Sequence, residues 1–418
     1  MSYFKTGMIF AIPTICKLLA GLMVVKVMAI YLGADGLGRL GQFMSLLTIV
    51  TMLAGGGIST GIVKYVAQFK SEPLRLSEYV QTASFITLIS SVLVGILLYF
   101  CSEYISIFLV KSKLYEYEIK VLAFAQFSMA LSTFLLGILN GYRLVNEFAV
   151  INIGSIVLGS IGVIIGCAYF GSSGAMFGIM WYSSCQIIFL LIWYKYKFEF
   201  SLSFVKPRWL SKIGRKYAHF ALMQLVTVST LQVSQIIMRN IIEEKTSWIE
   251  VGYWQGLIRI SDAYLQFITV VLASYYMPRL SEAKNKLEIV KEVCTVYKIV
   301  IPLLLVLMPI IFFLRVEIIQ ILFSKEFLAM SDLFIWQIAG DFFKVIAYIA
   351  GYVAIAKAAT RIYILADVFQ ALTLVLLCYF FVNYFGIKGA VYAYFLTYFI
   401  YAVSALFLLK IYLKNKFI

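Results

Sequence analysis

The sequence predicts an all-α polytopic membrane protein with about twelve transmembrane helices in two six-helix lobes. Of its 418 residues, 63% are hydrophobic and 13% are charged, whereas a soluble domain is nearer half apolar and a quarter charged. Because about 20 apolar residues cross a bilayer as a helix, the chain is long enough for about twelve crossings joined by short connections. This composition excludes a secreted disulfide scaffold, a nucleic-acid-binding domain and a soluble enzyme.

Apolar runs bounded by Gly, Pro and charged residues define the expected helices in chain order. The first half contains runs at 8–32, 40–62, 79–101, 119–141, 149–170 and 175–195. The second half contains runs at 217–239, 251–276, 296–314, 332–356, 361–383 and 388–410. The first run is longer than the apolar core of a signal peptide and lacks a cleavage pattern, so we expect it to be retained. Runs of this length, without alternation, exclude a transmembrane β-barrel.

The connections between the runs predict the orientation. An even number of runs places both termini on one side, and Lys and Arg concentrate in the segments on that side, which makes it cytoplasmic. The most basic segment separates the sixth and seventh runs and contains Lys195, Lys197, Lys206, Arg208, Lys212, Arg215 and Lys216. It is interpreted as a topology anchor attracted to anionic headgroups, with docking of a pathway partner as the alternative. We expect lobes at 1–196 and 217–418, joined by the basic connection 197–216.

An internal repeat favours the six-plus-six layout. The motif YFGSSGA at 169–175 matches YFGIKGA at 384–390. Gly38 and Gln42 pair loosely with Gly252 and Gln255, and the Gly-Tyr step at 141–142 recurs at 351–352, all at similar offsets. Halves with six spans each share one orientation, which is typical of a parallel repeat about an axis along the membrane normal.

Ionisable residues inside the apolar runs are the candidate functional positions. Each costs a few kcal/mol at a helix centre if it faces lipid, so they must face protein or a wet cavity. They are Lys17, Lys26, Arg259, Asp262, Asp341, Lys344 and Asp367. Four cations against three acids predict a weakly positive interior.

Two of these pairs have i, i+3 spacing, which places both side chains on one helix face. The pairs are Arg259 with Asp262 and Asp341 with Lys344. Each is either a structural ion pair that makes burial tolerable or a pair that opens, so that the cation meets an anionic substrate or the Asp exchanges a proton. The spacing leaves both interpretations open.

The remaining charges carry weaker expectations. Lys17 and Lys26 lie on nearly opposite faces of a straight helix, so both reach one cavity only if the helix bends or Lys26 snorkels outward. Lys17 is the deeper of the two and is expected to line the cavity. Asp367 has Arg361 and Lys357 nearby as structural partners, and the single histidine, His219, is interpreted as an interfacial side chain rather than a proton relay.

Several kinds of chemistry have no support in the sequence. There is no G-x-x-x-x-G-K-[ST] phosphate loop, which argues against an ATPase. The six cysteines lie in or beside apolar runs without a C-x-x-C pair, so we expect neither disulfides nor a metal site. No carboxylate dyad or activated nucleophile is visible. We therefore expect no enzyme activity and no cofactor.

Three segments resemble a known family. ISDAYLQFIT at 260–269, the stretch 332–367 and GIVKYVAQ at 61–68 are similar to segments of Wzx-type lipid-linked oligosaccharide flippases, which include O-antigen translocases and lipid III flippases. The resemblance spans essentially the whole chain, with 260–269 and 332–367 the most specific matches. It implies the multidrug/oligosaccharidyl-lipid/polysaccharide exporter fold, with two lobes around a central cavity.

The resemblance also implies a function and roles for the charges. The function is translocation of an undecaprenyl-pyrophosphate-linked glycan from the cytoplasmic to the periplasmic leaflet of the bacterial inner membrane. Membrane lipids are implied partners, with the pathway's polymerase and chain-length regulator as further candidates. The cations of the cavity would bind the diphosphate; they are Lys17, Lys26, Arg259 and Lys344. The acids would take part in coupling or in ion pairs; they are Asp262, Asp341 and Asp367. The glycan and the coupling ion stay open.

Three other functions compete with this one. A multidrug exporter of the same superfamily would need an acidic cavity for cationic drugs, and the predicted interior is not acidic. A membrane-embedded glycan polymerase or transferase would need a long exoplasmic loop with essential acidic or Arg residues. A purely structural membrane protein would have little reason to carry seven intramembrane charges.

Overall fold

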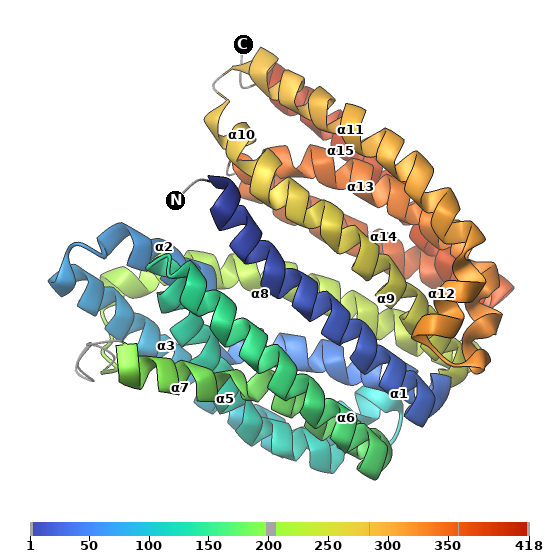
Figure 1. The fold of residues 1–418 in the computed structure, drawn as a ribbon, viewed down its shortest axis with the longest axis horizontal. Helices are drawn as coiled ribbons and strands as arrows, with labels where there is room; N and C mark the ends of the chain where they lie inside the picture. Colours follow the sequence, from blue (N-terminus) through green and yellow to red (C-terminus); the bar gives the residue numbers. More distant parts are fainter. Residues whose placement is uncertain (1–2, 198–205, 284, 358, 416–418) are drawn as a thin grey trace. The chain divides into compact units, whose positions relative to one another are not determined.

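The computed structural model describes residues 3–197, 206–283, 285–357 and 359–415. Every regular element in these ranges is a helix (Figure 1), which confirms the predicted all-α class. Part of the expected connection 197–216, namely residues 198–205, lies outside the described residues.

Nine stretches of the described chain are long and apolar enough to cross a membrane. They are Cys16–Ala54, Pro73–Phe100, Glu116–Gly141, Val145–Lys195, Ser211–Lys245, Lys286–Phe313, Lys325–Ala356, Ile364–Phe385 and Ile387–Lys414. Cys16–Ala54 and Val145–Lys195 each span two predicted runs, with breaks at Gly33 (φ 64) and Gly171 (φ 59). The predicted run 251–276 falls largely on a further helix, α9, which carries three charged residues. The exact number of twelve therefore stays a prediction.

The described chain forms two compact units. Unit 1 comprises Met1–Leu32 and Leu40–Gln232. Its helices are α1 (Tyr3–Ala54), α2 (Ser59–Phe69), α3 (Pro73–Phe100), α4 (Ser102–Val110), α5 (Glu116–Gly141), α6 (Val145–Ser184), α7 (Gln186–Lys197) and the first part of α8 (Ser211–Lys245). Within this unit α5 is central, because it packs against α2, α3, α4, α6 and α7.

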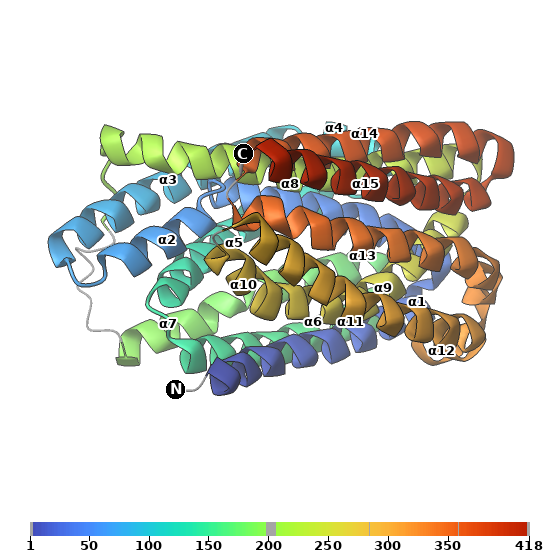
Figure 2. The ribbon, with the colours of Figure 1, turned by 90° about the horizontal axis from the view of Figure 1, so that it is seen from above.

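Unit 2 comprises Gly33–Arg39 and Val233–Ile418. Its elements are α9 (Trp248–Val271), a π-helical turn (Leu272–Tyr276), α10 (Met277–Glu282), α11 (Lys286–Phe313), α12 (Arg315–Leu322), a 3₁₀ segment (Lys325–Leu333), α13 (Phe334–Ala356), α14 (Thr360–Phe385) and α15 (Ile387–Asn415). Helices α13, α14 and α15 lie side by side (Figure 2), and α13 also contacts α9 and α11.

The predicted run 40–62 is broken in the structure. Gly56 and Gly57 adopt φ values of 70° and 64°, which an L-residue with a side chain rarely adopts. Helix α1 therefore ends at Ala54, and the separate helix α2 begins at Ser59. The hydrophobic pattern of the sequence does not reveal this turn, because a turn made by glycines needs no polar residue to interrupt the apolar run.

The two YFG motifs fold in the same way. Gly171 has φ 59° and ψ −137°, and Gly386 has φ 57° and ψ −140°. Three residues later, a Cβ on Gly174 or Gly389 would lie 2.0 or 2.2 Å from a carbonyl oxygen of the preceding helix. Each motif thus makes a tight helix–helix turn that only glycine permits at both positions.

The segment Gly33–Arg39 belongs to unit 2, although both flanking segments belong to unit 1. Both carboxylate oxygens of Glu326 accept from the backbone N–H of Ala34 at 3.4 Å. A negative group at this position satisfies the free N–H groups that follow the break at Gly33. Arg39 pairs with Asp35 at 2.8 Å and lies over the Trp248 ring.

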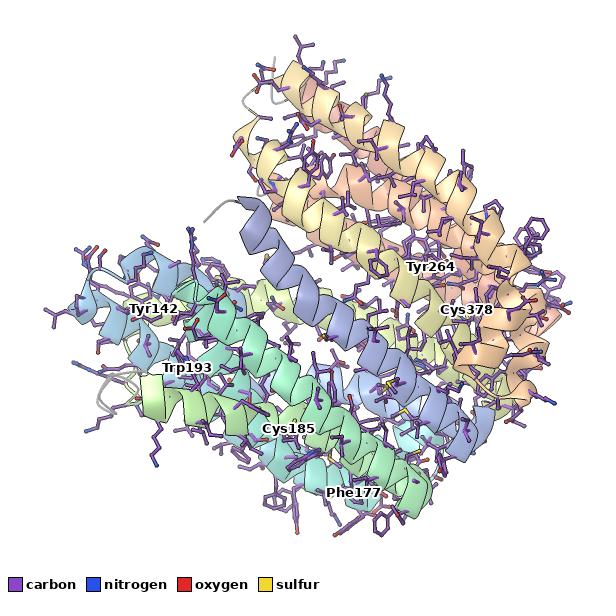
Figure 3. The ribbon with its side chains drawn as sticks, in the orientation of Figure 1. Tyr142, Phe177, Cys185, Trp193, Tyr264 and Cys378 are labelled. Atoms are coloured by element: carbon purple, nitrogen blue, oxygen red, sulfur yellow. The ribbon has the colours of Figure 1, made fainter. Side chains whose placement is uncertain are left out.

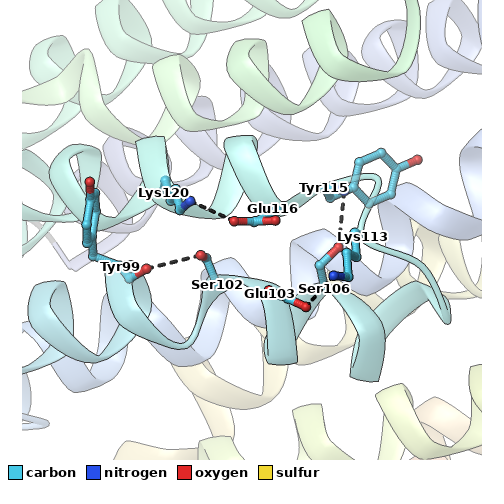
Figure 4. Close-up of polar contacts among 8 residues, drawn as sticks. All are labelled: Tyr99, Ser102, Glu103, Ser106, Lys113, Tyr115, Glu116 and Lys120. Carbon is cyan, nitrogen blue, oxygen red and sulfur yellow. Dashed lines mark hydrogen bonds and ion pairs between the residues drawn. The ribbon is translucent and has the colours of Figure 1, made fainter.

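A polar corner joins α3, α4 and α5 (Figure 4). Ser106 donates to the Ser112 carbonyl at 2.8 Å and accepts from the Tyr115 N–H at 3.1 Å. Lys113 pairs with Glu103 at 2.6 Å, and this hydrogen bond raises the pKa of Lys113. These contacts satisfy backbone groups at the turn and hold the short helix α4 against α5.

Candidate functional site

A buried acid on α13 is the centre of the candidate site. The side chain of Asp341 is fully buried, and Lys344 lies one turn further along the same helix, half-buried. Burying a carboxylate is costly unless it is hydrogen-bonded, so its partners define the site. Both residues lie on α13, three positions apart, the spacing from which one shared helix face is predicted.

Two tyrosines from other helices hold the carboxylate. The hydroxyl of Tyr264, on α9 (Figure 3), donates to Oδ2 of Asp341. The hydroxyl of Tyr394, on α15, donates to Oδ1 at 2.6 Å. When the acid is ionised, such hydrogen bonds are stronger than those between neutral groups. The carboxylate thus ties three helices of unit 2 together.

Tyr394 also links the acid to the cation. The ammonium of Lys344 donates to the Tyr394 hydroxyl at 3.3 Å. Its nitrogen also lies 5.3 Å from the ring centre of Tyr398 and 5.9 Å from that of Tyr348, within cation–π range. Among the ion pairs of the described residues, none joins Asp341 to Lys344 directly. The Tyr394 hydroxyl therefore bridges the carboxylate of Asp341 and the ammonium of Lys344.

A close helix contact makes this geometry possible. A Cβ on Gly340 would lie 2.5 Å from Cδ1 of Tyr394 and 3.2 Å from the Cα of Phe395. Glycine at 340 therefore lets α15 approach α13 closely enough for the Tyr394 hydroxyl to reach Asp341.

Neutral polar side chains support the network. Gln337 donates to Ser261 at 3.1 Å, and Gln370 donates to the hydroxyl of Tyr398 at 2.8 Å. Lys344 and Tyr348 line a cavity of ≈ 10 Å³, about the size that holds one water molecule. Lys344 therefore borders a small internal space.

The pair formed by Arg259 and Asp262 is arranged differently. Arg259 is half-buried, and Asp262 is exposed, both on α9. A third charge in this region, Arg239, was not among the predicted positions and is 4% exposed. Its Nε donates to Gln255 at 3.0 Å, and its guanidinium lies over the Trp254 ring. The expected helix end at 239 concealed this residue, because α8 continues to Lys245.

The other predicted positions lie outside the Asp341 network. Lys17 and Lys26 are exposed on α1, and His219 is exposed on α8. Asp367 is half-buried on α14. Lys357, one of its expected partners, donates instead to the backbone carbonyls of Ser281 and Ala283, at 3.4 and 2.6 Å.

The missed tyrosines had only a weak sequence signal. Tyr264, Tyr348, Tyr394 and Tyr398 lie among 29 tyrosines in a chain that is 17% aromatic. Nothing in composition distinguishes a tyrosine that donates to a buried carboxylate from one that faces lipid headgroups.

Among the described residues, no group of three or more His, Cys, Asp or Glu is arranged to hold a metal ion.

An all-helical, multiply spanning chain with charges buried between its helices defines a membrane transporter fold, and comparison with solved structures agrees. An inward-facing multidrug resistance MATE transporter of the MOP superfamily superposes with a TM-score of 0.80, at 15% identity over 95% of this chain and 94% of that one. The lipid II flippase MurJ, in an inward closed conformation, gives 0.73 at 19% identity, over 96% and 87%. These likenesses establish the MOP fold.

The family follows from sequence. A family model described as "Polysaccharide biosynthesis protein" matches residues 27–332, and the chain belongs to that family. Lipid III flippases of Escherichia coli (strain K12) and Shigella flexneri are each 36% identical over 401 residues, covering 96% of both chains. The predicted resemblance to lipid-linked oligosaccharide flippases is confirmed, and the chain is a multi-pass membrane protein.

Proposed function

We propose that this protein is a flippase that moves an undecaprenyl-pyrophosphate-linked oligosaccharide from the cytoplasmic to the periplasmic leaflet. The observation that carries the proposal is 36% identity over 96% of the length of two lipid III flippases. Relatives that translocate lipid-linked glycans support a transporter rather than an enzyme. The same relatives favour a glycan of the enterobacterial common antigen type, with an O-antigen unit as the other candidate.

We place the protein in the bacterial inner membrane with both termini in the cytoplasm. The excess of Lys and Arg in the connections on one side supports this orientation. Two lobes of six helices would alternate access to the two leaflets. The lipid-linked glycan and membrane lipids are its partners, with the pathway's polymerase and chain-length regulator as candidate protein partners.

The charge network suggests how a substrate and an ion are coupled. Lys344, Arg259, Lys17 and Lys26 are each candidate ligands of the diphosphate. Asp341 would exchange the coupling ion, with Asp262 and Asp367 as further acidic positions. Tyr394 donates to Asp341 and accepts from Lys344. Protonation of Asp341 would weaken its bond to Tyr394, and a looser Tyr394 would free the Lys344 ammonium for an anion.

A multidrug exporter is the second candidate, because the MATE transporter shares the fold with a TM-score of 0.80. At 15% identity that likeness concerns the fold alone. An exporter of cationic drugs needs acids that outnumber the bases in its cavity. The seven charges predicted inside the membrane are four cations and three acids, and the buried Arg239 adds a further cation, which favours an anionic substrate.

Complementation tests the proposal. In cells that lack their own Wzx-type flippases, the wild-type protein should restore surface glycan, and the lipid-linked repeat unit should move to the periplasmic leaflet. Arg259→Ala should abolish display while leaving the protein inserted at wild-type level. Arg75→Ala, at an exposed pair with Glu72, is the matched control. Failure across several repeat units, with correct insertion, would overturn the flippase assignment.

A further inference from the structure

A second polar site lies inside unit 1. A cavity of ≈ 400 Å³ is lined by residues of α1, α2, α5, α6, α7 and α8 and by the turn between α1 and α2. More than half of its lining residues carry a hydroxyl or an amide, and none of these described residues is charged. A cavity of this size is in the range of small-molecule sites.

Three threonines present hydrogen-bond acceptors to this cavity. The hydroxyls of Thr48, Thr51 and Thr133 donate to backbone carbonyls one turn back, at 2.9, 2.8 and 2.9 Å. A hydroxyl has one proton and two lone pairs. Because each hydroxyl proton is donated to a carbonyl of its own helix, these side chains can only accept hydrogen bonds from a ligand.

Ser132 provides a second and independent indication of a ligand. Its side chain is 2% exposed and lines the cavity, and its hydroxyl has no hydrogen-bond partner among the described residues. Buried polar groups are normally paired. Gln186 also lines the cavity and donates to Asn152 at 3.2 Å, while its amide has a further N–H and a carbonyl oxygen.

We propose that this cavity binds a neutral sugar ring of the lipid-linked glycan, an inference that rests on the proposed function. Sugar hydroxyls donate hydrogen bonds that match the threonine acceptors, and the C–H face of a pyranose fits apolar lining residues such as Leu47, Met52 and Val228. The uncharged lining excludes the diphosphate as its ligand, because a buried anion requires cations or several donors.

Close backbone packing and an aromatic core border the cavity and make its walls rigid. Gly57, in the turn that borders the cavity, has φ 64°, and a Cβ there would lie 3.1 Å from the Cα of Ala221. Beyond this turn, Tyr65, Tyr79 and Tyr217 belong to one buried aromatic core. A rigid frame reduces the entropic cost of ordering a site when a weakly held sugar binds.

Binding of a free sugar tests the inference directly. The full-length protein in lipid nanodiscs would be titrated with N,N′-diacetylchitobiose, a neutral disaccharide, and binding followed by saturation-transfer NMR. Thr51→Val/Thr133→Val removes two hydroxyls at constant side-chain shape and should weaken binding about tenfold or more. Thr373→Val is the matched control, because Thr373 makes the same local bond at 2.8 Å on α14; its binding should equal that of wild type.

Ser132→Ala is a second variant, which removes a buried and unpartnered hydroxyl and should therefore fold normally while weakening binding. Equal affinity in wild type and both cavity variants, or no saturation transfer with the wild-type protein, would overturn the inference. Flipping of a lipid-linked saccharide in proteoliposomes separates the two proposals. Sugar binding without flipping contradicts the proposed function alone, and flipping with unaltered binding in the variants contradicts the sugar site alone.

Discussion

At the residue scale, the hydroxyl of Tyr394 is the shared atom of the candidate site. It donates to the carboxylate of Asp341 at 2.6 Å and accepts from the ammonium of Lys344 at 3.3 Å. A phenol has a single proton to donate, so the state of Asp341 determines how firmly this hydroxyl is held. Tyr264 provides the second donor to the same carboxylate.

We expect Asp341→Asn and Tyr394→Phe to lower transport at least about tenfold, because each removes a charge-assisted hydrogen bond that is worth about 1.5–3 kcal/mol. The rate of transport is measured in proteoliposomes, and the loss of stability is measured by thermal unfolding in detergent. Asp332→Asn, at an exposed carboxylate before α13, is the control and should retain wild-type transport. Unimpaired transport by Asp341→Asn would reduce Asp341 to a structural group.

At the element scale, glycines set the distances between helices. Gly340 allows α15 to lie against α13, because a Cβ there would collide with the Tyr394 ring. Gly171 and Gly386 reverse the chain between helices with nearly identical dihedral angles. In the first case the limit is space, and in the second it is backbone conformation.

Gly340→Ala should destabilise the protein by about 1–3 kcal/mol, the usual cost of overpacking a tight contact, and should reduce transport by displacing Tyr394. Gly351→Ala on the same helix is the matched control. A Cβ at 351 meets nothing within 4 Å, so this change should stabilise the helix by about 0.5–1 kcal/mol. The measurement is the unfolding temperature of each variant; equal values for the two would refute the close-contact argument.

Gly171→Ala isolates the effect of conformation, because no atom lies within 4 Å of a Cβ at this position. The backbone conformation, with φ 59° and ψ −137°, should nevertheless make the variant about 1–3 kcal/mol less stable. Gly21→Ala also places its Cβ in open space, but within a regular helix, and should not destabilise. The unfolding temperatures of the two variants are compared. An unchanged unfolding temperature for Gly171→Ala would show that the turn can adopt another backbone conformation without loss of stability.

At the scale of the whole molecule, orientation in the membrane is the first property to measure. Lys113 lies in an expected periplasmic connection, and Lys212 lies in the basic connection 197–216 that is expected in the cytoplasm; both are exposed in the structure. In a background without the six native cysteines, Lys113→Cys should react with an impermeant maleimide in intact spheroplasts. Lys212→Cys should react only after permeabilisation, and the reverse pattern would contradict cytoplasmic termini.

Properties that depend on local patterns could be predicted from the amino-acid sequence. Long apolar runs established a helical membrane protein, because a helix must be apolar over about 20 residues to cross a bilayer. The i, i+3 spacing placed Asp341 and Lys344 on one face, and the YFG motifs marked two turns that fold alike. Segments at 260–269 and 332–367 carried the family resemblance.

Only the tertiary structure decided which side chains meet. Tyr264 and Tyr394 are 77 and 53 positions from Asp341, and packing of α9 and α15 on α13 brings them to its carboxylate. Arg239 is buried on a helix that extends past its expected end, and the hydroxyl-lined cavity combines residues of six helices. Hydropathy and periodicity record how each helix faces its surroundings, whereas the partner of a polar group depends on how helices pack, which no local pattern encodes.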